Sequence, residues 1–434
     1  MAADHALGEI RVRPWNVARW ALWGSTVAAL LLLPLVFRGG FALTLMSQMG
    51  VMVIFALSYN MLLGQGGMLS FGHAVYSGLG AFVVIHAMNR IGAGTLAWPV
   101  SLLPLLGAVG AAFFGVVFGF LTTRRAGTPF AMITLGIGEL VFAAALMFPG
   151  WSGGEGGVTG NRTAGAPFLG IEGWTFGSQL QVYYLIAAWC LICMVGMYAL
   201  TQTPLGRIAN AVRDNPERAE FIGYNTQRVR WLTLILSSFF AGIAGALTAI
   251  NFEIVSAENL SAVRSGAVLL ATFIGGAAFY FGPILGAVVF TFFAVALSEY
   301  TKAWQLYLGV FFVLLVLFAP GGLSSLILMN LRVAKFRQFA RLRDPYVGAL
   351  LTALALSLGI VGLIELTYHV TLDVGQGPMV SLFGVPFDTS KPGAWALASA
   401  LTVGAAFGFD YYRRVFANAW TAVQRDIDHL QRET

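Results

Sequence analysis

The stretch Leu62–Phe82, "LLGQGGMLSFGHAVYSGLGAF", decides the fold because it interrupts a long apolar segment. Residues 39–89 contain no Asp, Glu, Lys or Arg, which is typical of a membrane-embedded segment. As one helix these 51 residues would extend about 77 Å, far beyond the roughly 30 Å hydrocarbon core of a bilayer. The glycines Gly64, Gly66 and Gly67 therefore predict a break between two membrane-spanning helices.

The composition places the whole chain in the membrane. Of its 434 residues, 58% are hydrophobic and only 10% are charged, whereas a soluble domain has about 25% charged residues. Uncharged runs of about 20 residues recur along the chain, and such runs predict spanning helices rather than the short alternating strands of a barrel. We therefore predict an all-α, polytopic helical membrane protein. The net charge of +6 is better explained by basic residues that set the orientation of a membrane protein than by nucleic-acid binding.

Hydropathy predicts single spans along the rest of the chain, and a second segment that is too long for one helix. Residues 265–298 would extend about 51 Å and contain Phe281-Gly282-Pro283 in the middle, so they also predict two helices. The single spans are Trp20–Phe37, Trp98–Leu121, Pro129–Phe148, Val182–Leu200, Trp231–Phe252, Ala303–Phe318, Tyr346–Ile364 and Gly393–Phe409. We expect the first of them to be retained, because no small-residue cleavage site follows it.

The distribution of basic residues predicts the orientation. With twelve crossings and a cytoplasmic N-terminus, 19 of the 25 Lys and Arg residues fall on the cytoplasmic side. Treating either long segment as one crossing would destroy this bias. The predicted regions are a cytoplasmic segment 1–19, a transmembrane domain 20–329 with an external Gly-rich loop 149–180 and a cytoplasmic loop 201–230, a basic linker 330–345, two additional helices in 346–410, and an amphipathic cytoplasmic tail 411–434.

The cytoplasmic loop "TQTPLGRIANAVRDNPERAEFIGYNTQRVR" has the start and stop signals of two short helices. Thr203 can cap a first helix that begins at Pro204, and Asn215-Pro216 repeats the same signal. Gly223 is placed to end the second helix. From spacing alone, a solvated connector is favoured over a docking element, because short motifs are weak signals.

Several motifs in fixed order resemble one family of transporters. They are "MLLGQGGMLSFGHAVYSGLGAF", "RRAGTPFAMITLGIGELV", "GGEGGVTG", "TPLGRIANAVRDNPERAEFIGYN", "IGGAAFYFGPILGAVVF" and "LGVFFVLLVLFAPGGL". Together they resemble the permease subunits of branched-chain amino acid ABC importers, specifically the M-type subunit, over roughly Phe41 to Leu323. The residues after Leu323, with two further spans, fall outside this pattern.

The resemblance implies a subunit of about ten core helices in the bacterial inner membrane, with both termini cytoplasmic. It implies a second permease subunit, two ATPase subunits that bind ATP and Mg²⁺, and a periplasmic binding protein. It also implies that the loop 201–230 docks on an ATPase, through the matching residues Gly206, Arg207, Ala211, Arg213, Asn215, Ala219 and Gly223. The chain contains no GxxxxGK[ST] motif, so we expect a transport subunit without cofactor or ATPase site of its own.

Polar residues in the spans are candidates for the translocation pathway because they are costly there. Glu139 is either a pathway group or a neutral structural acid, and His73 is more often a contact between helices. Ser70 fits an N-cap for the helix after the break. The break itself is either part of the pathway or an ordinary cytoplasmic turn. The candidate pathway residues are Gln65, Gly66, Gly67, Ser70, His73, Tyr76, Thr134 and Glu139.

The remaining features predict packing rather than chemistry. The pair Cys190/Cys193 and the small residues Gly115/Gly119 and Ala241/Gly245 fit helix contacts, so we expect no metal site. The external Gly-rich loop is expected to be flexible. In the tail, Trp420, Val423, Ile427 and Leu430 share one helical face that suits a membrane interface or a partner.

Two other classes of function compete with an importer permease. A secondary transporter or channel working alone would predict more buried acids and an internal repeat. A membrane enzyme would need clustered catalytic groups, which the five scattered histidines do not supply. The solute remains open among branched-chain amino acids, urea or amides, and aromatic acids.

Overall fold

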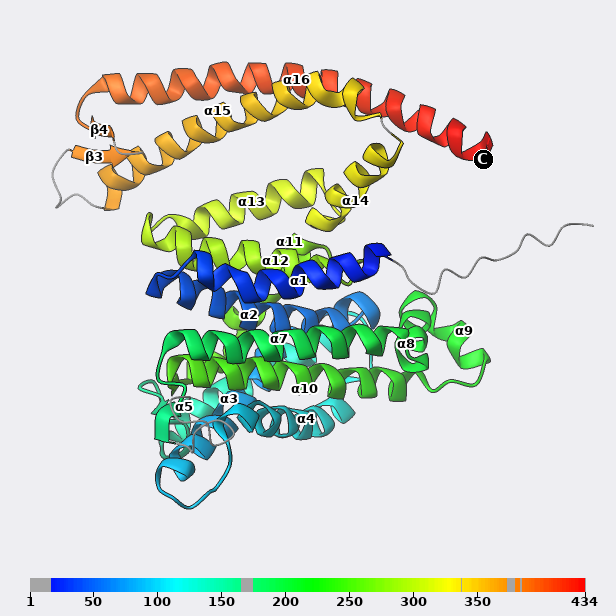
Figure 1. The fold of residues 1–434 in the computed structure, drawn as a ribbon, viewed down its shortest axis with the longest axis vertical. Helices are drawn as coiled ribbons and strands as arrows, with labels where there is room; N and C mark the ends of the chain where they lie inside the picture. The colour runs from blue at the N-terminus through cyan, green and yellow to red at the C-terminus, as the bar shows by residue number, and fades with distance from the viewer. Residues whose placement is uncertain (1–16, 165–174, 337, 373–378, 383–384, 434) are drawn as a thin grey trace, which may run out of the picture. The chain divides into compact units, whose positions relative to one another are not determined.

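The computed structural model describes residues 17–164, 175–336, 338–372, 379–382 and 385–433, and this part of the chain is almost entirely helical (Figure 1). Most of the predicted N-terminal segment 1–19 lies outside the described residues. The chain divides into two compact units, the first ending at Phe292 and the second beginning at Phe293.

The first unit contains the helices that match the predicted core. Its long helices are α1 (Val17–Val36), α2 (Gly40–Asn60), α3 (His73–Gly92), α4 (Leu103–Thr122), α5 (Thr128–Met147), α7 (Gln179–Gln202), α10 (Thr226–Phe252), α11 (Ala262–Gly275) and α12 (Gly282–Thr291). Its short elements are η1 (Met61–Gln65), η2 (Val100–Leu102), α6 (Pro149–Ser152), β1 (Val158–Thr159), η3 (Arg162–Ala164), α8 (Pro204–Asp214), α9 (Pro216–Phe221), β2 (Ile254–Val255) and η5 (Ala257–Leu260).

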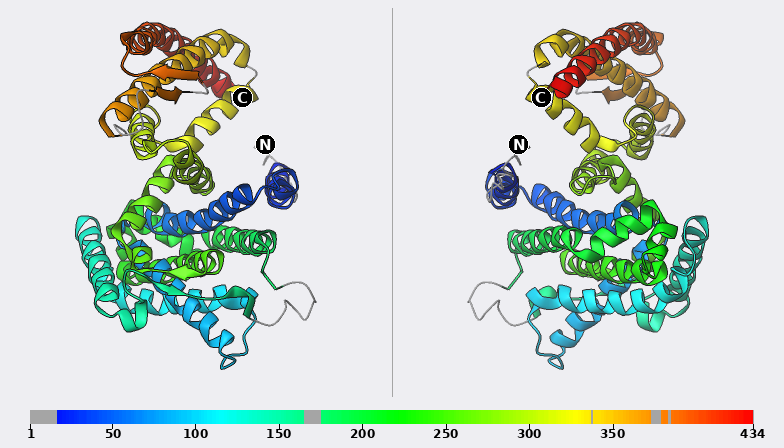
Figure 2. Two further views of the ribbon diagram at one scale, coloured as in Figure 1. Left: turned by 90° about the vertical axis from the view of Figure 1, so that its left-hand side faces the viewer. Right: turned by 90° about the vertical axis from the view of Figure 1, so that its right-hand side faces the viewer.

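The second unit is built around a long antiparallel helical hairpin. Its elements are η6 (Phe292–Ala296), which starts on the last residue of the first unit, η7 (Leu297–Glu299), α13 (Trp304–Phe318), α14 (Gly322–Lys335), α15 (Phe339–Leu372), β3 (Met379–Leu382), β4 (Val385–Asp388) and α16 (Pro392–Glu433). α15 and α16 run side by side (Figures 1 and 2), and β3 pairs with β4 where the hairpin turns.

The described helices confirm a polytopic membrane protein. Eight are long and apolar enough to cross a bilayer, or nine if the bent pair α13–α14 is one span. α3 has the required length, but it carries His73, His86, Asn89 and Arg90 and does not reach that apolar level. Both predicted breaks are present, one between η1 and α3 and the other between α11 and α12.

The core of the first unit forms around α10, and small residues let its neighbours approach closely. A Cβ at Gly245 would overlap the Ser77 carbonyl of α3, and a Cβ at Gly115 of α4 would lie 2.8 Å from Ser238 of α10. Gly119 faces Leu234 in the same way. These contacts confirm the sequence prediction that the small-residue pairs pack helices together.

The Gly-rich loop that the sequence predicts to be external makes specific contacts with the rest of the first unit. β1 pairs antiparallel with β2, with Val158 opposite Val255. The guanidinium of the buried Arg162 donates to the carbonyls of Phe176, Ile250 and Asn251. Where the structure describes it, this loop is therefore anchored to the end of α10. One buried arginine satisfies several carbonyls at once and holds this part of the loop predicted to be flexible.

The apolar face of the predicted tail is used inside the second unit. Val423 and Ile427 of α16 are fully buried against Val333 of α14 and Leu342 of α15. Trp420 packs against the same cluster, while the side chain of Leu430 lies outside the described residues. This face is therefore already occupied by its own chain, and it does not lie free for a membrane surface or a partner.

Candidate functional site

The loop that the sequence predicts to be cytoplasmic, residues 201–230, forms a helical hairpin, α8–α9, at one end of α7 and α10 (Figure 1). The Thr203 hydroxyl accepts a hydrogen bond from the Gly206 amide (3.3 Å), and the Asn215 side chain accepts one from the Arg218 amide (2.9 Å). Gly223 follows the second helix with φ +95°, a conformation that favours glycine. All three predicted helix signals are confirmed.

The hairpin has a small core of its own. Ala209 and Val212 of α8, Ala219 of α9 and Val229 of α10 are buried together. Among the residues carried over from the family, Gly206 is buried as well. A Cβ there would lie only 2.9 Å from the Cα of Thr201, so no larger side chain fits. Gly206 and Ala219 therefore shape the hairpin from within, and they do not lie on its outer surface.

The outer surface of the hairpin carries two apolar residues that sequence reasoning missed. Phe221 is 91% exposed and Ile222 is 70% exposed, at the end of α9. The carried-over Arg207 and Ala211 of α8 and the capping residue Asn215 are also exposed. The signal was present in the sequence as "EFIGY", an apolar pair at the predicted end of a polar helix.

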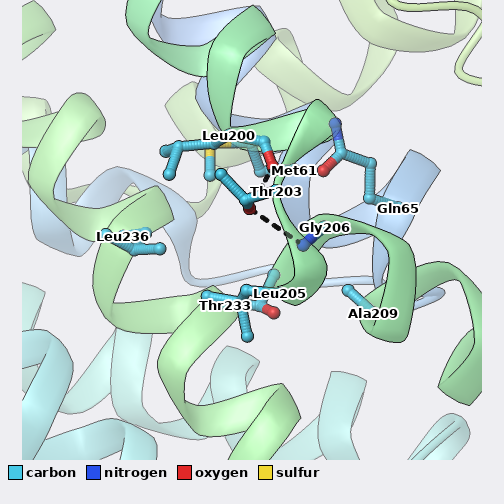
Figure 3. Close-up of a pocket in the computed structure, with 9 residues that line it drawn as sticks. All are labelled: Met61, Gln65, Leu200, Thr203, Leu205, Gly206, Ala209, Thr233 and Leu236. Atoms are coloured by element: carbon cyan, nitrogen blue, oxygen red, sulfur yellow. Dashed lines mark hydrogen bonds between the residues drawn. The ribbon is translucent and has the colours of Figure 1, made fainter.

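α8 packs directly against η1, the last turn before the helix break. A cleft of only about 10 Å³ lies between them, which is room for a single water molecule. Figure 3 shows how Gln65 and Met61 of η1 face the α7–α8 turn across this cleft. It is lined by Met61, Gln65, Leu200, Thr203, Leu205, Gly206, Ala209, Thr233 and Leu236. We call this close contact between α8 and η1 the joint. Its cleft is too small for a solute.

Arg213 connects the hairpin to the break itself. Its guanidinium donates to the Gly64 carbonyl, and its Nε donates to the Asp214 carboxylate at 2.8 Å. A Cβ at Gly67, which has φ +63°, would lie 2.7 Å from the Cγ of Arg213. The resemblance suggests that Arg213 faces a partner subunit, but in this chain its side chain lies against the break.

The backbone after the break is irregular and is covered by protein. The Tyr59 hydroxyl donates to the Ser70 carbonyl (2.9 Å), and the Phe71 amide donates to the Thr134 hydroxyl of α5 (3.2 Å). Ser70 is not the N-cap, since α3 begins at His73 and Gly72 precedes it. A Cβ at Gly72 would overlap the Thr134 carbonyl, so the chain turns into α3 pressed against α5.

α3 begins inside the first unit rather than at the end where α8 lies. His73 is fully buried, its Nε2 lies 3.0 Å from the Ser58 hydroxyl, and its ring stacks on Phe55 of α2. Ser58 precedes Gln65 by seven residues, which corresponds to about 10 Å along a helix. The tip of the break therefore lies beside α8, while the irregular segment runs about 10 Å into the interior.

The structure brings the candidate pathway residues together only in part. Gln65 and Gly67 lie at the joint with α8, and Gly66 is buried in the same turn. Tyr76 is buried beside the His73 ring (centroids 6.0 Å apart), and Thr134 contacts the irregular segment. Glu139 lies apart from them, on an exposed face of α5.

The fold and this joint define a class: a polytopic membrane permease in which a short helical hairpin contacts a broken helix. Comparison with known families agrees with that class. The family described as "Branched-chain amino acid transport system / permease component" matches residues 41–319, and the chain belongs to this family.

Relatives in this family carry several kinds of cargo. The chain is 28% identical to the high-affinity branched-chain amino acid transport system permease protein LivM of Salmonella typhimurium, over 67% of this chain and 71% of the relative. It is 27% identical to LivM of Escherichia coli K12 (63% and 67% covered). It is also 27% identical to the fructose import permease protein FrcC of Rhizobium meliloti (46% and 56% covered). No solved structure gives a significant match.

Proposed function

We propose that this protein is a permease subunit of an ATP-driven importer for branched-chain amino acids or related small polar or carboxylate solutes. It forms half of a pathway with a second permease subunit in the bacterial inner membrane, with both termini in the cytoplasm. A periplasmic binding protein delivers the solute. Two ATPase subunits bind ATP and Mg²⁺, and this chain has neither a cofactor nor an ATPase site.

The observation that carries the proposal is the joint between the hairpin and the break. Phe221 and Ile222 offer an apolar contact at the tip of α9, of the kind that anchors protein interfaces. Movement of the hairpin is passed on through Arg213, which holds the Gly64 carbonyl. A rigid, bonded element of this kind can transmit movement from a partner to a membrane helix. A secondary transporter or channel working alone has no use for such a tip.

Association with the ATPase subunits tests the proposal. We expect the double variant F221A/I222A to weaken this association about 30-fold or more, since removing one central apolar anchor costs about 2 kcal/mol. The matched control is Y411A on α16, which removes an aromatic side chain that is 63% exposed. Co-purification and titration with the ATPases measure both. Equal binding by F221A/I222A and the wild type would contradict the proposal.

A further inference from the structure

α11 is too short to cross the membrane and begins in the interior of the first unit. Its 14 residues extend about 21 Å, less than the roughly 30 Å hydrocarbon core. The hydroxyl of Ser265, in its first turn, accepts a hydrogen bond from the Ala74 amide at the start of α3 (3.0 Å). The segment before α11 enters alongside α3, where a Cβ at Gly78 would lie 2.7 Å from the Asn259 carbonyl.

Arg264 is placed in this interior first turn without a counter-charge. Its guanidinium donates to the Asn259 side chain (3.0 Å) and to the Thr248 hydroxyl of α10 (3.2 Å), both of which are neutral. Its Nε is buried without a hydrogen-bond acceptor, and no ion pair found among the described residues includes it. The residue as a whole is partly accessible, next to Val263, which is 82% exposed.

Arg162 shows what a purely structural arginine looks like in the same unit. Its guanidinium is enclosed by backbone carbonyls of residues 176, 250 and 251, and its side chain is almost completely buried. Arg264 differs in both respects, because it keeps an unused N–H donor and remains partly open. An arginine within a membrane segment is costly, and two neutral acceptors do not offset its charge.

We propose that Arg264 binds the carboxylate of the transported solute as it passes through the pathway. A carboxylate accepts two N–H groups of a guanidinium and supplies the missing negative charge. This inference rests on the permease function proposed above and narrows its solutes to small carboxylates, in contrast to the neutral fructose of one relative's name. Discontinuous helices that begin within the membrane are a common place for such sites.

The test is uptake of radiolabelled L-leucine by cells that contain the complete transport system and a variant of this chain. We expect R264Q to lower uptake at least tenfold, and R264K, which keeps the charge but loses the paired N–H geometry, to lower it less than R264Q does. The matched control R38Q replaces an exposed arginine and should leave uptake unchanged. Co-purification with the ATPases confirms that each variant assembles.

Three results would overturn the inference: wild-type uptake by R264Q, equal loss in assembled R264Q and R264K, or a wild-type system that takes up D-fructose and not L-leucine. In each of these cases the permease function would stand. Failure of that function has a different signature, namely a wild-type chain that neither binds the ATPases nor supports ATP-driven uptake of any solute.

Discussion

α10 and the α15–α16 hairpin are similar in apolar character but differ in how they are covered. In its most apolar window α10 is 83% buried by its own chain, whereas α15 is 11% buried and α16 is 6% buried. α10 lies within the part that matches the family, residues 41–319, and the hairpin lies beyond it. Hydropathy alone therefore does not separate a helix that is packed inside its own chain from one that its own chain leaves mostly uncovered.

The largest expected difference concerns glycines in the two regions. Gly245 of α10 lies against the Ser77 backbone, whereas a Cβ at Gly404 of α16 would meet nothing within 4 Å. We expect G245L to abolish uptake and to lower stability by about 3 kcal/mol or more, because it overpacks a close helix contact. G404L should change neither. Uptake assays and thermal unfolding in detergent measure both, and a neutral G245L would mean that the packing of α10 is wrong.

A smaller difference is expected for serine hydroxyls. Ser265 caps α3 from another helix, while Ser357 of α15 bonds only to the Ala353 carbonyl of its own helix. Replacing Ser265 with alanine should cost about 1 kcal/mol, a typical value for a lost cap or interhelical hydrogen bond. S357A should be neutral within about 0.5 kcal/mol. If the two variants shift Tm equally, the cap between helices does not contribute to stability.

Glu365 makes a polar contact within the second unit. Its carboxylate accepts hydrogen bonds from the hydroxyls of Thr301 (2.6 Å) and Tyr307 (2.7 Å), which connects α15 to the start of α13. We expect E365Q to lower the free energy of unfolding by less than about 1 kcal/mol and to leave uptake unchanged. A large loss of uptake in E365Q would show that the α15–α16 hairpin takes part in transport.

The smallest expected effect is a pH dependence at the turn after β4. Hydrogen bonds from Ser390, together with Lys391, hold the pKa of the Asp388 carboxyl below its ordinary value. A lowered pKa means that the carboxylate stabilises this turn above its ordinary titration range and that the effect is lost as pH falls through the folded-state pKa. The protection of the Ser390 amide against hydrogen exchange, measured relative to its intrinsic exchange rate at each pH, should fall in acid, and D388N should remove that dependence.

Much of this architecture follows from the sequence, because apolar length, glycine clusters and capping residues act locally. The two helix breaks and both helices of the α8–α9 hairpin were predicted in this way. The predicted N-cap at Ser70 was wrong. The amide of Ala74 at the start of α3 instead donates to the hydroxyl of Ser265, which lies almost 200 residues away in the sequence. The position of Arg213 against Gly64 and the exposure of Phe221 depend on tertiary packing, which one sequence does not report.

In the proposed mechanism α8 and the end of α2 move as one body, so that the α8–α9 hairpin drives the helix break. A reducible thiol cross-link between Q65C and A209C, which face the small cleft in Figure 3, tests it most directly. The native Cys190 and Cys193 are buried and do not compete. We expect the cross-linked complex to keep at least half of its ATP-driven uptake. Uptake that is lost on cross-linking and recovers on reduction would contradict it, since the two elements would then have to separate during transport.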